Sequence, residues 1–320
     1  MNIPVIDEKN IFEILQVKEH AYHREYYAFY SSWFGGIIKN PHFMLLPIDD
    51  HIVHRGDGVF EGMKVIAGAV YLLDEHLQRL IISANKISLK LAFSFDEMKQ
   101  IILKTLVTAD QENAMVRIYL SRGPGGFSVD PYESVKSQFY VVVTQLKSPS
   151  AKKYEEGAVI GKCNINIVPS WLAQAKSCNF IPNVLMKKEA VDRKLDFVIG
   201  IDKYGYVTEG ASENIIIVDE NETIIHPELD YILKGTMMTR ACELAQEHGY
   251  VTQIKNIKLE DLQSAREIMM AGTSLNLLPV VQYENHKIGN GIPGPISKKL
   301  NELILADIAN GCHSTPFKDL

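Results

Sequence analysis

Residues 147–157 (KSPSAKKYEEG) divide the chain into two parts. The stretch is small, charged and proline-containing, and its lack of an apolar period is typical of a linker. Residues 26–146 before it and 158–320 after it each combine strand and helix patterns. With 320 residues, 46% of them hydrophobic, the chain can bury a core in each part. We therefore expect an N-terminal arm at 1–25, a small domain at 26–146, an interdomain linker at 147–157 and a large domain at 158–320.

Hydrophobic spacing predicts the secondary structure within these parts. Helices are expected at 74–89 with Asp74 as the cap, and at 96–109, 236–248 and 295–309. Strands are expected at 115–121, 138–145, 158–168, 197–201, 214–218, 223–226, 267–272 and 279–284. Because strands and helices mix without strict βαβ alternation, the pattern favours two α+β domains.

Composition excludes several classes of protein. The net charge of −6 argues against nucleic acid or an anionic membrane as the main partner. We find no basic and apolar targeting signal and no apolar run that could span a bilayer, which favours a cytoplasmic protein. The four cysteines form no CxxC pair, and the spacing of His51 and His54 lacks a third ligand, so no metal site is expected.

Lys176 stands alone between Ala175 and Ser177, just before the helix start of "IPN". Most lysines in such a place keep the amine at the surface. A functional lysine would need a desolvated amine, because desolvation lowers its pKa, and a neutral amine can form a Schiff base with a carbonyl or with pyridoxal phosphate (PLP). Both readings are open on this residue alone.

Glu209 precedes a turn in "VTEGASENIIIV" (207–218). A glutamate there is usually solvated, but a PLP enzyme needs a carboxylate against the pyridine nitrogen to keep the ring an electron sink. A phosphate needs donors, and "LKGT" (233–236) puts a glycine at a helix start, where free N–H groups suit an anion. "AGTSLN" (271–276) offers further hydroxyls, and Arg79 could add charge.

The segments "HRGDGVFEGMKV", "YLLDEHLQRL", "AKSCNFIPNVLMKKEA", "VTEGASENIIIV", "LKGT" and "AGTSLNLLPVV" resemble the class IV, fold-type IV PLP aminotransferases. The similarity runs in order over residues 29–304. It implies a two-domain, D-aminotransferase-like fold with the cofactor at the domain interface. The motifs nearest the N-terminus look most like the branch of D-amino-acid transaminases and aminodeoxychorismate lyases, which is related to the branched-chain aminotransferases.

The resemblance also implies roles for individual residues. Lys176 is implied as the Schiff-base lysine, Glu209 as the partner of the pyridine nitrogen and Arg79 as a phosphate ligand. Further phosphate contacts are implied for Thr236, for the backbone N–H of Met237 and for Thr273. The substrate pocket is expected to include Arg55, Phe60, Arg117, Arg122, Phe180 and Ser274.

The arginines bear on the substrate, because a planar guanidinium binds an α-carboxylate well. By resemblance Arg122 matches the carboxylate-binding arginine of D-amino-acid enzymes, and Arg117 matches an arginine of branched-chain enzymes. The sequence departs from the family at Phe180, where many relatives have tyrosine, at Met238, where an arginine is usual, and at Asn276, where a glutamate is common.

We therefore expect a homodimeric PLP aminotransferase that moves an amino group from a D-amino acid such as D-alanine to 2-oxoglutarate or pyruvate. The alternatives are a branched-chain L-amino-acid aminotransferase, an aminodeoxychorismate lyase and a catalytically silent PLP-binding homologue. The intact set of Lys176, Glu209 and Arg79 argues against the silent homologue. Small molecules are the expected partners, with no nucleic acid and no membrane.

Overall fold

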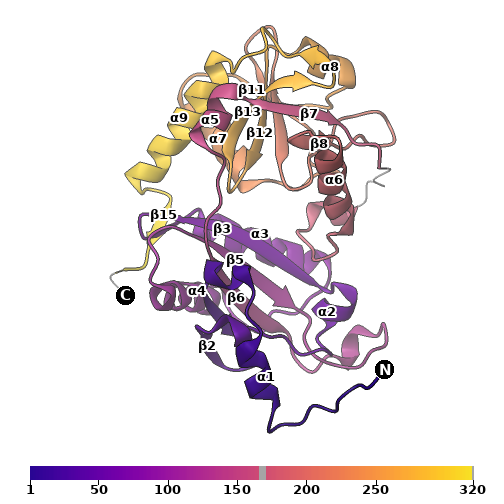
Figure 1. Cartoon of the computed structure of the whole chain (residues 1–320). Coiled ribbons are helices and arrows are strands. Elements are labelled where there is room, and N and C mark those ends of the chain that lie inside the picture. The colour runs from indigo at the N-terminus through magenta and orange to yellow at the C-terminus, as the bar shows by residue number, and fades with distance from the viewer. Residues whose placement is uncertain (166–170, 319–320) are drawn as a thin grey trace.

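The computed structural model describes residues 1–165 and 171–318 and contains two β-sheets with helices packed on them (Figure 1). The first sheet is antiparallel, in the order β15-β4-β3-β5-β6-β1-β2. Its strands are β1 (Tyr26–Ser31), β2 (Gly36–Ile38), β3 (Gly58–Ile66), β4 (Ala69–Tyr71), β5 (Ala114–Ser121), β6 (Gln138–Thr144) and β15 (Ser314–Pro316).

The second sheet is mixed, in the order β11-β10-β9-β12-β13-β7-β8, with β14 paired to β13. Its strands are β7 (Ala158–Lys162), β8 (Phe197–Ile199), β9 (Asn214–Val218), β10 (Ile224–His226), β11 (Thr252–Ile254), β12 (Glu267–Gly272), β13 (Asn276–Tyr283) and β14 (His286–Lys287). The parallel pairs are β10 with β11, β13 with β7 and β7 with β8. Two sheets mixed with helices confirm the expected α+β class.

Nine α-helices are assigned in the part of the chain that the structure describes. They are α1 (Ile11–Val17), α2 (His51–Arg55), α3 (Leu73–Lys86), α4 (Phe95–Ala109), α5 (Ala151–Glu156), α6 (Ile181–Asp192), α7 (Thr236–Glu247), α8 (Leu259–Ser264) and α9 (Pro295–Asn310). Within those described residues, no helix combines the length and the apolar character that a membrane crossing requires.

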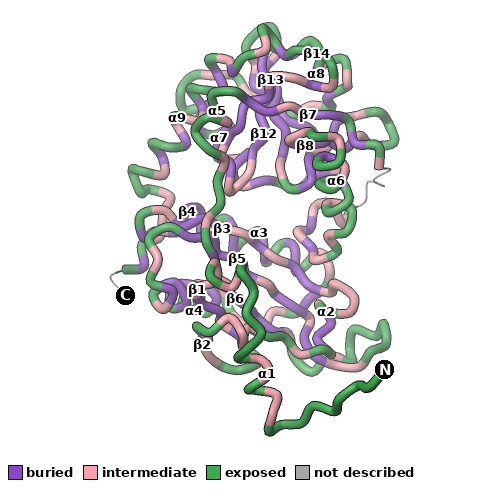
Figure 2. Tube along the Cα trace, in the orientation of Figure 1, coloured by how far each residue is buried: buried purple, intermediate pink, exposed green. Residues whose placement is uncertain are grey.

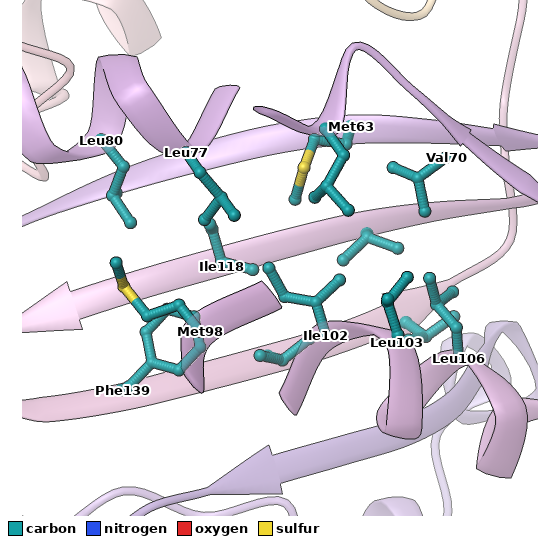
Figure 3. Close-up of a cluster of buried hydrophobic side chains, with 14 of the residues drawn as sticks. Met63, Val70, Leu77, Leu80, Met98, Ile102, Leu103, Leu106, Ile118 and Phe139 are labelled. Atoms are coloured by element: carbon teal, nitrogen blue, oxygen red, sulfur yellow. The ribbon is translucent and has the colours of Figure 1, made fainter. Parts of the chain in front are cut away.

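Helices α3 and α4 cover one face of the first sheet and close its core (Figure 3). The apolar positions expected on each helix point inward, because residues spaced three and four apart share one helical face. The side chains that meet there include Met63, Leu77, Leu80, Met98, Ile102, Ile118 and Phe139. Ser94 and Glu97 form a capping box that starts α4.

Helix α3 starts differently from the expectation. Leu72, in a left-handed conformation, is the N-cap, and Asp74 lies in the first turn of the helix instead of capping it. The Asp74 carboxylate accepts from Lys99 Nζ at 2.6 Å, so it ties α3 to α4.

Strand β9 shows how the second sheet is buried on both faces. All five of its residues are buried. Ile216 and Val218 join a core with α7 and α9, whereas Ile215 and Ile217 join a core on the opposite face. The alternation follows from the two-residue period of a strand.

The C-terminal segment connects the two sheets. After α9 in the second part of the chain, β15 pairs with β4 of the first sheet and Phe317 enters the first core (Figure 1). Asp307 of α9 accepts from Tyr71 Oη at 2.6 Å and from Arg240 Nη2 at 2.8 Å. The first sheet therefore includes residues from 158–320, and the domain division expected above stays a prediction.

The expected linker includes a short helix, and one expected strand is shorter than predicted. Residues 147–157 contain α5, which Ser150 caps by accepting from the Lys153 N–H, so this stretch is partly helical. The strand expected at 158–168 ends at Lys162, and residues 166–168 lie outside the described part of the chain. The N-terminal arm is mostly exposed along its length (Figure 2).

Candidate active site

The backbone around Lys176 is held between β3 and α3. Phe60 N donates to the Lys176 carbonyl at 2.9 Å, and Cys178 N donates to the Gly58 carbonyl at 2.9 Å. On the other side, Lys176 N donates to Ser83 Oγ of α3 at 3.1 Å. These main-chain bonds fix where the lysine side chain starts, which a reactive amine requires.

The setting of the Lys176 amine favours its neutral form. Its Nζ lies 4.8 Å from the centre of the Phe60 ring. Burial lowers the pKa of Lys176, and the positive charge of Arg79 adds to this, while Glu61 and Glu209 oppose it. An amine with a lowered pKa can act as a nucleophile or carry a proton near neutral pH.

Glu209 is held by two donors on one oxygen. Its Oε2 accepts from Asn214 Nδ2 and from Leu233 N, both at 3.2 Å. Burial raises the pKa of Glu209 to about 8. A cationic ring N–H beside this carboxyl would stabilise its ionised form, because the positive charge would offset the free-energy cost of ionising a buried carboxyl.

Lys176 and Glu209 line the same cavity, which has a volume of about 190 Å³. Phe180 lines it too, and the Phe180 ring stands perpendicular to Phe60 with the centroids 5.3 Å apart. The structure therefore brings an amine, a carboxyl and two aromatic rings together from segments far apart in the sequence.

Arg79 reaches from α3 to the start of α7. Its Nε and Nη2 donate to the two carboxylate oxygens of Glu61 at 2.7 and 2.8 Å, and its Nη1 donates to the Lys234 carbonyl at 2.9 Å. Both contacts fix the guanidinium close to the first turn of α7, where the sequence led us to expect an anion.

The first turn of α7 offers main-chain donors. Its N-cap is Gly235, which has no side chain to bond the turn, and the first N–H groups of a helix have no intrahelical acceptor. The Met237 side chain is buried in the second core, so only its backbone can face a ligand. A Cβ on Gly235 would lie 1.8 Å from Asn214 Oδ1, so this close approach requires glycine.

Thr273 and Ser274 lie in the turn between β12 and β13. Ser274 lines a second cavity of about 440 Å³ together with Arg117 and Tyr119 of β5. The Phe60 ring lies 6.0 Å from the Tyr119 ring and so stands between the two cavities. Next to the turn, Lys64 of β3 donates to Asn276 Oδ1 and joins the two sheets.

The three expected arginines differ in their settings. Arg122 donates to Asp57 at 2.6 Å and to the carbonyls of Ser88 and Ile87 at 3.1 and 3.0 Å. Each of its three nitrogens thus donates a hydrogen bond within its own chain, and the expected role of Arg122 in binding a substrate carboxylate stays a prediction. Arg117 is exposed and donates to Thr144 Oγ1 at 3.0 Å.

Arg55 has unused donors. Its Nη1 donates to the Ser128 carbonyl, but Nε and Nη2 are buried and have no hydrogen-bond partner among the described residues. Buried nitrogens of a charged group are costly when unpaired. Of the three arginines, Arg55 is the one that an incoming carboxylate would satisfy.

Three of the buried polar residues that contact Arg79, Glu209 or Thr236 were not expected from the sequence. They are Glu61, His76 and Asn214. The signal for Glu61 was a charged residue on the inward face of "VFEGMKV", shared with Val59 and Met63. For His76 it was the spacing of three to Arg79 on one helix, which places both side chains on the same face.

The sequence of the chain is similar to those of a known protein family. The family model "Amino-transferase class IV" matches residues 58–283. The chain is 33% identical to a chloroplastic D-amino-acid transaminase of Arabidopsis thaliana, over 97% of this chain and 83% of that protein. It is 30% identical to a putative branched-chain-amino-acid aminotransferase of Methanocaldococcus jannaschii, over 79% of this chain and 88% of that one.

The fold is also found among solved structures. A branched-chain amino acid aminotransferase from T.th., solved with pyridoxamine 5'-phosphate, superposes with a TM-score of 0.83 at 22% identity. The match covers 92% of this chain and 99% of that one.

Proposed function

The chain belongs to the class IV aminotransferases, which use PLP, and we propose that it transfers the amino group of a D-amino acid such as D-alanine to 2-oxoglutarate or pyruvate. The observation that carries the choice of a D-amino acid is the 33% identity with a D-amino-acid transaminase over 97% of this chain. Arg55, with its unpaired buried nitrogens, is the proposed partner of the substrate α-carboxylate.

The residues present fit PLP. A buried carboxyl whose pKa burial has raised to about 8 suits a pyridine nitrogen, and an amine with a lowered pKa suits an aldehyde. Arg79 and the uncapped first turn of α7 suit a phosphate. We propose that Lys176 and Glu209 hold the ring, and that Arg79, Thr273 and the main-chain N–H groups of Thr236 and Met237 hold the phosphate.

When bound, PLP would supply an electron-withdrawing ring that stabilises negative charge at the substrate α-carbon. The chain's own groups do the remaining work. Lys176 Nζ takes a proton from that carbon and returns one, which its lowered pKa makes feasible. Glu209 retains the proton at the ring nitrogen, while Phe60 and Phe180 exclude water from this side of the cavity.

The second cavity is the proposed place for the rest of the substrate. Arg117 and Ser274 line it, and Phe60 separates it from Lys176. An acceptor such as 2-oxoglutarate carries a second carboxylate, which Arg117 could bind.

Donor specificity tests this proposal directly. The purified holoenzyme should transaminate D-alanine with 2-oxoglutarate and leave L-leucine almost untouched. A preference for L-leucine would overturn the D-amino-acid proposal in favour of a branched-chain enzyme. Pyruvate release from aminodeoxychorismate without an amino acceptor would favour the lyase.

We further propose a homodimer. Large apolar side chains are exposed on the segments at 33–48 and 127–135. The chain next to each segment is close to the other, because Gly125 N donates to the Asp49 carbonyl at 3.1 Å. The exposed side chains are Trp33, Phe34, Leu45, Leu46, Ile48, Phe127, Val129, Tyr132 and Val135. An exposed apolar surface of this kind is typical of a subunit interface. Sedimentation should give a dimer, and a monomer active at assay concentration would contradict it.

Arg55 contacts the second of these segments, since its Nη1 donates to the Ser128 carbonyl. It is not among the described residues that line the cavity of Lys176. We therefore propose that Arg55 binds the α-carboxylate in the site of the second copy. Arg55→Met should lower kcat/KM for D-alanine by about 10- to 100-fold, mainly through KM, because a hydrogen bond to a charged group is lost. Arg266→Met, in an exposed arginine just before β12, is the control and should change kcat/KM little.

Mixed dimers show whether Arg55 acts in the site of its own chain or in the site of the second copy. Each of Arg55→Met and Lys176→Ala should be weak alone. If Arg55 serves the second copy, coexpressed chains should form dimers with one intact site and recover activity. Mixed dimers that stay as inactive as either parent would show that Arg55 acts in its own site or not at all.

A further inference from the structure

Glu61 is a fully buried carboxyl that the proposed reaction does not use. Its Oε1 accepts from Arg79 Nε at 2.7 Å, and its Oε2 accepts from Arg79 Nη2 at 2.8 Å and from His76 Nδ1 at 2.7 Å. Burial alone would raise the pKa of Glu61, but Arg79 and His76 together hold it well below its usual range. Glu61 is therefore an ion that can only accept hydrogen bonds.

This carboxylate determines which nitrogen of His76 carries the proton. An unprotonated Nδ1 would place two acceptors 2.7 Å apart, so Nδ1 must be N–H. Arg79 Nη2 also lies 3.5 Å from Nδ1, but that nitrogen already donates to Glu61 at the shorter distance. Burial lowers the pKa of His76. The positive charges of Arg79 and Lys176 lower it further, while Glu61 opposes the shift. The ring is therefore neutral, and its Nε2 is an acceptor.

The neutral ring then fixes the hydroxyl of Thr236. Thr236 Oγ1 lies 3.3 Å from His76 Nε2. Since Nε2 carries no proton, the hydroxyl must donate its only hydrogen to it. The Thr236 oxygen can offer a ligand lone pairs alone, which repel a phosphate oxygen.

We propose that Glu61 and His76 are positioning residues that set the donor pattern of the phosphate site. Through them the Thr236 hydroxyl is turned away from the phosphate, which is bound instead by the main-chain N–H groups of Thr236 and Met237 and by the unused N–H bonds of Arg79. This inference rests on the proposed function, because it assumes a phosphate at the start of α7.

Thr236→Val is the sharpest variant, because valine keeps the shape of threonine and removes only the hydroxyl. The dissociation constant for PLP, measured by titrating the apoprotein, should change less than about threefold. The melting temperatures of the apoprotein and the holoprotein should both fall, since His76 Nε2 loses its donor in both. A loss of affinity of about tenfold or more would show that the hydroxyl donates to the phosphate and would overturn the proposal.

Glu61→Gln tests whether Glu61 sets the donor pattern of the phosphate site. A glutamine side chain has an NH2 donor in place of one carboxylate oxygen, so it cannot accept all three of the hydrogen bonds that Glu61 takes from Arg79 and His76. We expect the dissociation constant for PLP to rise about tenfold or more. Glu75→Gln, in an exposed glutamate of α3 one turn away from Arg79, is the control and should leave the affinity unchanged.

Nitrogen-15 NMR of histidine-labelled apoprotein reads the tautomer without PLP. The His76 signals, assigned by their loss in His76→Gln, should show a protonated Nδ1 and an unprotonated Nε2 at pH 7, and Glu61→Gln should change them. A protonated Nε2, or a spectrum and an affinity that Glu61→Gln leaves alone, would overturn the proposal. Failure of the wild-type protein to bind PLP would instead refute the proposed function, and the NMR result would still decide the tautomer.

Discussion

Replacing Lys176 with alanine should lower the transamination rate by more than about 10³-fold, because the variant loses the group that moves the proton at the substrate α-carbon. Main-chain bonds to β3 and α3 hold the backbone of Lys176, and among the described residues that line the cavity it is the one lysine. The wild-type protein should be yellow, and borohydride should attach the cofactor covalently to the peptide that contains Lys176.

The matched control is Lys188→Ala in α6. Lys188 is exposed and pairs with Asp192 on the same helix. Its replacement should leave both the rate and the borohydride label unchanged, because an exposed pair of this kind contributes little. Cofactor found on the peptide of Lys187 and Lys188, or a Lys176→Ala variant that turns over normally, would refute the assignment.

The parts of this site that are local in sequence could be predicted, and the class IV family, the α+β fold, the enzyme class and the cofactor are confirmed. The setting of Lys176 in the sequence left two interpretations open, and its motif, which runs into the start of α6, resembled that of the family. The start of α7 at Thr236 followed from the glycine before it. In both places the signal lies within a few residues of the group that carries it.

Contacts between residues that lie far apart in the sequence could not be predicted. Arg122 matched a motif, but its contacts with Asp57 and with the carbonyls of residues 87 and 88 join segments that no local pattern places side by side. Glu61 lies on the core face of β3, and only the packing of α3 shows that a histidine and an arginine cover it.

The same limit applies to the fold. Strand β15 pairs with β4, more than two hundred residues earlier in the chain. Its residues Ser314–Pro316 are too few for a periodic signal. The pairing is specified by neighbours that α9 brings near, including the contact of Asp307 with Tyr71.

Glu209→Gln should lower kcat by roughly 10²- to 10³-fold and at the same time stabilise the apoprotein. The loss of rate follows because an amide cannot hold a proton at the ring nitrogen; removing one preorganised electrostatic group costs roughly 2–4 kcal/mol of transition-state stabilisation. The amide oxygen can still accept from Asn214 and Leu233, so the fold should be kept. Unchanged turnover would contradict the role.

The gain in stability follows from the pKa of Glu209, which burial raises from 4.5 to about 8. Between these values the unfolded chain releases the proton while the folded apoprotein keeps it, so a rise in pH favours the unfolded wild type. The variant has no such proton. Its advantage in free energy of unfolding should therefore be near zero below pH 4.5, grow by at most about 1.4 kcal/mol per pH unit, and level off above pH 8. Denaturant titrations of both apoproteins from pH 5 to 8 measure it, and a difference that does not change with pH would show that the Glu209 carboxyl is already ionised in the folded apoprotein.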